Sequence, residues 1–111
     1  MIRMQIVERP GAKLFSLLKR AIRSKELRTF SLERHGTRVV HIRSPGHMVW
    51  TGTEGIIACE IRSPREEGKE WQFLTNLVGR LADCYPEFVE SINIQLTAPP
   101  VVPVKKKRRR K

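Results

Sequence analysis

The chain is poor in the residues that disulfide, metal and redox chemistry use. Its 111 residues include two cysteines, Cys59 and Cys84, and one aspartate, Asp83. Neither cysteine belongs to a CxxC motif, so we expect two reduced, buried thiols and no disulfide framework. The shortage of carboxylate clusters argues against a metal-dependent nuclease, which needs grouped carboxylates to hold its ions.

Long apolar runs are also missing. No segment approaches the ~20 consecutive apolar residues of a membrane span. The N-terminal stretch alternates apolar and polar residues and lacks the unbroken apolar region of a secretory signal. We therefore expect a cytoplasmic protein that does not contact a membrane.

Motifs that identify common enzyme classes do not occur. The sequence has no GxSxG, GxGxxG, HExxH or Walker-type loop. Glu66, Glu67 and Glu70 form a cluster, but they lie at the expected start of a helix, where negative charge complements the helix dipole. We interpret this cluster as structural, and we expect no metal, cofactor or small-molecule substrate.

The three histidines, His35, His41 and His47, recur at intervals of six residues. In a hairpin that turns at 44–46 they would not face one another, so a three-histidine metal site is disfavoured. His41 is expected on an open sheet face beside Arg43, where it would be a candidate general acid or base, as in a metal-free ribonuclease. Apart from His41, the sequence offers no specific ground for an enzyme.

Positive charge is what the sequence has in excess. Its 22 Lys and Arg residues and 11 Asp and Glu residues give a net charge of +11. Residues 1–43 hold eleven of the basic residues and three glutamates, whereas residues 44–104 hold four basic and eight acidic residues. The last seven residues are all basic and follow a segment rich in proline and valine. The basic character thus belongs to the first half of the chain as well as to its end.

Alternating and helical periodicities divide residues 1–96 into strands and two helices. The first segment alternates, with Ile2, Met4 and Ile6 on one face, and predicts a half-buried strand. Glycines and prolines separate the short apolar segments between the two helices. The predicted elements are strands at 1–8, 27–34, 37–43, 47–51, 56–61 and 88–96, and helices at 12–25 and 63–85, followed by a disordered tail at 97–111.

The two predicted helices differ in their charge. The second has a capping box at 63–66, becomes regular near Lys69 and ends before Pro86. The first has an apolar stripe formed by Leu14, Leu17, Leu18, Ala21 and Ile22. At about 100° per residue, its opposite side carries four basic residues, Lys13, Lys19, Arg20 and Arg23.

The order of elements, β-α-β-β-(β-β)-α-β, predicts an α+β fold in a single domain at 1–96. We expect a two-layer sandwich of the ferredoxin-like kind, with one mainly antiparallel sheet and both helices on one face. Val39, Arg43 and Val49 are expected on the open face of the sheet with His41. Trp50 is a loose candidate for stacking on a base.

The basic helix face and the basic tail favour a non-catalytic, sequence-tolerant nucleic-acid-binding protein, with RNA or a ribonucleoprotein as partner. The tail also resembles a nuclear-import signal, which would indicate a nuclear location in a eukaryote. The predicted contact residues are Lys13, Lys19, Arg20, Arg23, Arg43, Lys105, Lys106, Lys107, Arg108, Arg109, Arg110 and Lys111.

A protein–protein interaction module is the alternative prediction. The acidic second half of the chain could dock against a basic first half, and an uncovered sheet face could bury against a copy of itself. Such a protein would be a small adaptor, inhibitor or assembly subunit, with a homodimer as one possible form.

Overall fold

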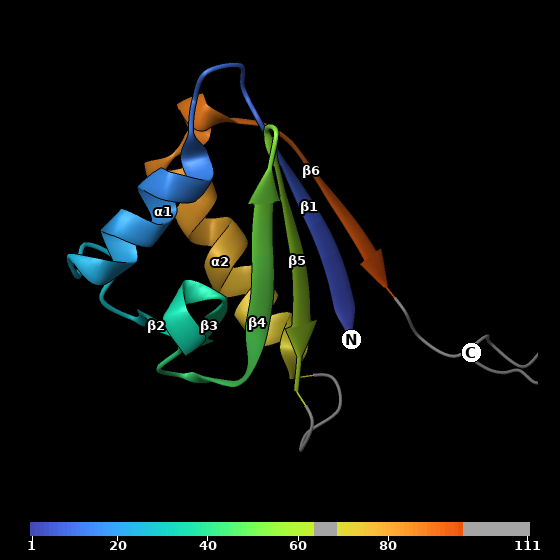
Figure 1. Cartoon of the computed structure of the whole chain (residues 1–111). Coiled ribbons are helices and arrows are strands. Elements are labelled where there is room, and N and C mark those ends of the chain that lie inside the picture. Colours follow the sequence, from blue (N-terminus) through green and yellow to red (C-terminus); the bar gives the residue numbers. More distant parts are fainter. Residues whose placement is uncertain (64–68, 97–111) are drawn as a thin grey trace, which may run out of the picture.

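The computed structural model describes residues 1–63 and 69–96, in which two helices pack on one six-stranded sheet (Figure 1). The predicted capping box at 63–66 and the predicted tail at 97–111 lie partly or wholly outside these residues. The elements are β1 (Ile2–Glu8), α1 (Leu14–Arg23), β2 (Phe30–Glu33), the 3-10 turn η1 (Arg34–Gly36), β3 (Arg38–His41), β4 (Ser44–Thr53), β5 (Ile56–Arg62), α2 (Glu70–Cys84), the 3-10 turn η2 (Pro86–Phe88) and β6 (Val89–Leu96).

The sheet is antiparallel throughout, with the strand order β2-β3-β4-β5-β1-β6. Both helices lie on the same side of it (Figure 1) and share one hydrophobic core with its strands. The prediction of an α+β fold with an antiparallel sheet and two helices is confirmed, whereas the ferredoxin-like order is not. No helix in the described part of the chain is long and apolar enough to cross a membrane.

The core is built from the apolar positions that the periodicities single out. In β1, Ile2, Met4 and Ile6 are fully buried, and the alternate residues Arg3 and Gln5 are exposed. Alternation puts every second side chain of a strand on the same face, so one face of β1 meets the helices and the other stays open. The buried residues of the helices are Leu14, Leu18, Ala21 and Ile22 in α1 and Phe73, Leu74, Leu77 and Leu81 in α2.

A carboxylate from the preceding strand stabilises the start of α1. The N-cap residue, Lys13, has no side-chain hydrogen bond to the helix. The N–H of Phe15 in the first turn instead donates to Oε2 of Glu8, at 3.1 Å. This bond satisfies one of the unpaired N–H groups at the helix start and places a negative charge at the positive end of the helix dipole.

The hairpin between β3 and β4 differs from its prediction. The chain turns at 42–43, where His41 pairs with Ser44, so the predicted turn at 44–46 is wrong. Gly46 instead lies within β4 with a φ of 87°, and a Cβ there would lie 2.0 Å from the carbonyl oxygen of Arg62. Glycine is required at this position by both the left-handed backbone and the close approach of β5.

Candidate nucleic-acid interface

The outer surface of α1 is basic. Lys13, Arg20 and Arg23 are exposed, and Lys19 is half-buried. All four lie away from the buried stripe of the helix, as its periodicity predicts. Four of the predicted contact residues therefore belong to one helix surface.

The turn η1 extends this surface beyond the helix. Arg34, His35 and Gly36 have positive φ angles of 50°, 57° and 87°, which makes three consecutive left-handed residues. A Cβ added to Gly36 would lie 3.2 Å from both Nη2 of Arg23 and Cε of Lys19. The turn is thus packed beneath two cations of α1, while its own Arg34 and His35 side chains are exposed.

Trp50 fixes the position of this turn from inside the core. Its indole N–H donates to the carbonyl oxygen of Gly36 at 2.7 Å, and its ring meets that of Phe15 edge to face, with centroids 4.9 Å apart. Nζ of Lys19 lies 5.0 Å from the centroid of Phe15, within the range of a cation–π contact. Because Trp50 is buried, the prediction that it could stack on a base is wrong.

We define the α1–η1 surface by six residues of α1, its N-cap and the η1 turn that packs against Lys19 and Arg23: Lys13, Lys19, Arg20, Arg23, Arg34 and His35. Within residues 1–63 and 69–96, no ion pair involves any of them. The Lys and Arg residues among them are uncompensated cations, which attract polyanions because each keeps its charge toward solvent. The sequence did not identify Arg34 and His35 as contact residues. The pair His35-Gly36 indicated a tight turn at this place, but nothing in the sequence indicated that the turn packs against α1.

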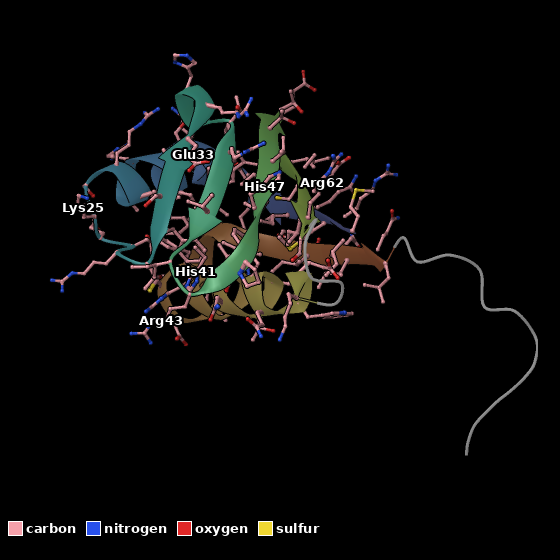
Figure 2. The ribbon with its side chains drawn as sticks, turned by 90° about the horizontal axis from the view of Figure 1, so that it is seen from below. Lys25, Glu33, His41, Arg43, His47 and Arg62 are labelled. Carbon is pink, nitrogen blue, oxygen red and sulfur yellow. The ribbon has the colours of Figure 1, made fainter. Side chains whose placement is uncertain are left out.

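Arg43, the fifth predicted contact residue in the described part, lies elsewhere. It occupies the β3–β4 turn and is exposed beside α2, whereas Lys25, which follows α1, lies on another side (Figure 2). Its charge, with that of Arg80 in α2, acts on His41. Arg43 therefore does not belong to the α1–η1 surface.

His41 is part of the core, so its predicted place on the open sheet face is wrong. Its ring packs against Phe30, with centroids 4.7 Å apart, and its Nδ1 accepts hydrogen bonds from the Arg43 N–H at 3.1 Å and the Ser44 hydroxyl at 3.2 Å. Asn76 of α2 in turn donates to Oγ of Ser44 at 2.9 Å. Burial, and then the charges of the two neighbouring arginines, lower the pKa of His41. His41 is therefore a neutral side chain that helps to join α2 to the β3–β4 turn, and its role is structural.

The two thiols also have different surroundings. Cys59 is buried, and burial raises its pKa to about 12, whereas Cys84 is exposed at the end of α2. The prediction of two buried thiols is thus wrong for Cys84. In the described part of the chain, no group of three or more His, Cys, Asp or Glu side chains is placed to hold a metal ion.

The open face of the sheet has a different character from the α1–η1 surface. Strand register aligns one row of side chains across all six strands: Glu33, Arg38, Val49, Glu60, Arg3 and Gln95. Its arginines lie beside carboxylates, with 3.9 Å between Arg38 and Glu33 and 3.7 Å between Arg3 and Glu60. Val49 is exposed there as predicted, but Val39 is buried in the core.

A shallow groove of about 440 Å³ lies on this face, over β4, β5, β1 and β6. Its lining mixes apolar residues such as Val49 and Ala58 with the polar residues Gln5, Thr51 and Asn93, and it includes the Arg3–Glu60 pair. The one aromatic residue that borders it, Trp50, directs its ring into the core. The groove therefore lacks the aromatic platform on which single-stranded bases stack.

Comparisons with protein-family models, with curated proteins and with solved structures each found no match for this chain. The functional assignment accordingly depends on the geometry and charge of its own surfaces.

Proposed function

We propose that this protein binds nucleic acid through the α1–η1 surface, without catalysis and without strong sequence preference, and that RNA or an RNA–protein particle is its partner. The observation that carries this proposal is the set of cations on α1 and η1 that form no ion pair in the described part of the chain. Phosphates would be the groups that they contact.

Cation release would supply most of the binding free energy. A protein that neutralises phosphates with Lys and Arg frees condensed counterions, and its affinity then falls steeply with salt. Lys and Arg on a helix surface contact phosphates rather than base edges, which makes such binding tolerant of sequence. The absence of stacking aromatics on the groove of the open sheet face supports the same phosphate-dominated mode.

The seven basic residues at 105–111, which lie outside the described residues, would act as an auxiliary arm. An arm of this charge raises the local affinity for a polyanion beside a surface that is already basic. Arg43 would contribute little, because it lies beside α2 and away from the main footprint.

The decisive experiment compares two triple variants with the same change in net charge. Lys19, Arg20 and Arg23 are replaced by glutamine in one variant, and Arg3, Arg9 and Arg62 in the other. All three residues of the second variant form ion pairs with Glu60 or Glu90. Binding to a fluorescent single-stranded RNA and to duplex DNA is measured by anisotropy between ~50 and ~300 mM salt, after circular dichroism has verified folding.

The α1 variant should lose affinity by roughly 100-fold or more at ~50 mM salt, and the slope of log affinity against log salt should fall by about 2 to 3. The control variant should lose less than ~5-fold, since its arginines are already compensated. Equal losses in the two variants would show that net charge alone drives binding. No binding of RNA or DNA by the natural chain at ~50 mM salt would refute the proposal altogether.

The role of the arm is tested in a chain of unchanged length in which residues 105–111 are all glutamine. We expect a weaker complex that still depends on the α1–η1 surface. If this variant binds no nucleic acid at low salt, the arm and not the helix is the binding site.

A further inference from the structure

The outer strand β6 leaves one side of its backbone without a partner among the described residues. It pairs with β1 and ends the sheet, and no described element lies beyond it (Figure 1). The opposite edge, β2, has four residues and continues directly into η1, whereas β6 has eight. Proteins commonly protect long edges with charge, proline or a bulge, because unpaired N–H and C=O groups recruit another strand.

The exposed edge of β6 carries none of these protections over its last six residues. Residues 91–96, with the sequence SINIQL, contain no charged residue and no proline, in a chain whose net charge is +11. The one register irregularity between β1 and β6 lies at Val7 and Glu8, at the other end of the strand. A neutral stretch of this kind offers no complementary charge to a basic or acidic peptide.

An apolar patch follows the same edge on the helix side of the sheet. Ile94 and Leu96 are 43% and 56% exposed, although they lie opposite the buried Met4 and Ile2 of β1. The reason is that the main contacts of α2 are with β4 and β5 rather than with β6. These two side chains lie on the core face of the sheet but beyond the cover of the helices.

Trp71 of α2 is another exposed apolar side chain. It is 48% exposed, whereas Phe73 of the same helix packs against Phe30 of β2 with ring centroids 5.9 Å apart. At about 100° per residue, Trp71 projects about 160° away from Phe73, and therefore away from β2. Large exposed apolar side chains that gather at one edge indicate an interface.

We propose that β6 pairs with β6 of a second copy of this chain, antiparallel and in a register centred on Ile94, to form a twofold symmetric dimer with a continuous sheet. In this arrangement opposite residues share a face, so helix-side residues must meet helix-side residues. The register places Ile94 opposite itself, Ile92 opposite Leu96 and Asn93 opposite Gln95. Apolar thus meets apolar and amide meets amide, with no charge between residues 92 and 96.

The pairing of residues 92–96 with the same residues of another chain is the reason that we propose a second copy as the partner of β6. Pairing the two edges satisfies the free backbone groups of both strands at once. It also brings the exposed apolar side chains of the two strands, Ile94 and Leu96 of each copy, together at the twofold axis. This inference is independent of the proposed nucleic-acid binding, because it uses neither the α1–η1 surface nor the basic arm.

The test measures the mass of the nuclease-treated full chain by analytical ultracentrifugation at ~300 mM salt, where polyanion contacts are weak. We expect a dimer at ~100 µM protein. Ile94→Lys should raise the dissociation constant at least ~30-fold, since a central apolar anchor is replaced by a charge. Val49→Lys, at an exposed apolar position on the open face, is the matched control and should leave the dimer intact.

A cysteine experiment tests the register without depending on the stability of the lysine variant. In a Cys84→Ser background, Ile94→Cys should oxidise to a disulfide-linked dimer, because position 94 faces its own copy. Ser91→Cys should not, since the two copies of position 91 would lie six residues apart along the strands, at ~20 Å. A monomeric wild-type chain at ~100 µM, a dimer that survives Ile94→Lys or is dissociated by Val49→Lys, or equal cross-linking at 91 and 94 would each overturn the proposal.

Discussion

The open sheet face and the α1–η1 surface both carry several cations, yet among the residues that the structure describes only those on the sheet face have carboxylate partners. On the sheet, Glu60 lies between Arg3 and Arg62, and Glu33 lies beside Arg38. On α1 and η1 the cations form no ion pair in residues 1–63 and 69–96. The difference arises because cross-strand register aligns opposite charges on the sheet, whereas the acidic residues of the chain are absent from the outer face of α1. The number of basic residues on a surface does not show whether a polyanion can bind there. What matters is whether carboxylates already pair with them.

Gly46 in the sheet and Gly36 in η1 differ in the space that surrounds an added methyl group. This contrast gives the largest predicted effect. Gly46→Ala should lower the free energy of unfolding by about 4 kcal/mol, because its Cβ would overlap backbone of β5 and its φ is positive. Gly36→Ala should cost only about 1–2 kcal/mol, since the atoms that its Cβ meets are the ends of Lys19 and Arg23. Urea unfolding of both variants measures the two values; similar losses would contradict the close approach at Gly46.

Removing the carboxylates of the sheet face should convert it into a second polyanion-binding surface. The double variant Glu33→Gln, Glu60→Gln leaves Arg3, Arg38 and Arg62 without their partners. Its affinity for RNA at ~50 mM salt should rise roughly threefold to tenfold above that of the natural chain, through additional phosphate contacts. The double variant Glu54→Gln, Glu87→Gln is the matched control, because it makes the same change in net charge and no ion pair in the described part of the chain involves either residue. An unchanged affinity in the Glu33→Gln, Glu60→Gln variant would mean that ion pairing with carboxylates does not explain why the sheet face should bind RNA less well than the α1–η1 surface.

Acid should weaken the contact between α2 and the β3–β4 turn through His41. Its pKa is lowered in the folded protein by burial and by the charges of Arg43 and Arg80, so the unfolded chain binds the proton more readily. Stability that is complete above pH ~6.5 should therefore fall as the pH drops below that value, by at most ~1.4 kcal/mol per pH unit for one group.

Unfolding in urea at pH 7.5, 6.5 and 5.5 checks this pH dependence. His47, whose pKa is also lowered by burial and by nearby arginines, contributes a second and parallel loss. His41→Gln should reduce the slope, and a His41→Gln, His47→Gln double variant should remove most of it. The same slope in the double variant and the natural chain would assign the pH dependence to other groups.

The smallest predicted effect is on the pKa of Glu60. A hydrogen bond from Arg62 at 2.6 Å is the main reason that this pKa is lowered, and the charge of Arg3 adds less. Arg62→Gln should therefore raise the pKa of Glu60 toward its ordinary value more than Arg3→Gln does. Carboxyl chemical shifts followed by NMR from pH 2 to pH 7 measure both values, and the reverse order would contradict the ion-pair geometry.

Much of the fold could be predicted from local periodicity. The alternation of β1, the apolar stripe of α1 and the alternation of β6 each assign side chains correctly, because one face of each element is clearly apolar. The pattern fails in β3 and the turn after it, where Val39, Val40 and Ile42 leave both faces apolar and His41 could belong to either. The face toward the helices was decided there by a turn at 42–43 and by packing against Phe73, which is distant in sequence.

The candidate site was likewise predictable in part. The four cations of α1 follow from helical spacing, since residues three and four apart share one side of a helix. Arg34 and His35 lie beside α1 because Gly36 packs against Lys19 and Arg23 and accepts a hydrogen bond from Trp50, fourteen residues away in the sequence. Arg43 was placed on the wrong element because its position depended on the misassigned turn.

The sequence by itself determined that this protein has excess positive charge, an amphipathic basic helix and no recognisable catalytic motif. Tertiary structure alone decided which of its cations are compensated. Pairs such as Arg3 and Glu60 lie far apart along the chain and meet only through strand register, which depends on the packing of the whole sheet. The charges of a protein are a property of its composition, but the field that a partner meets depends on which of those charges folding brings together.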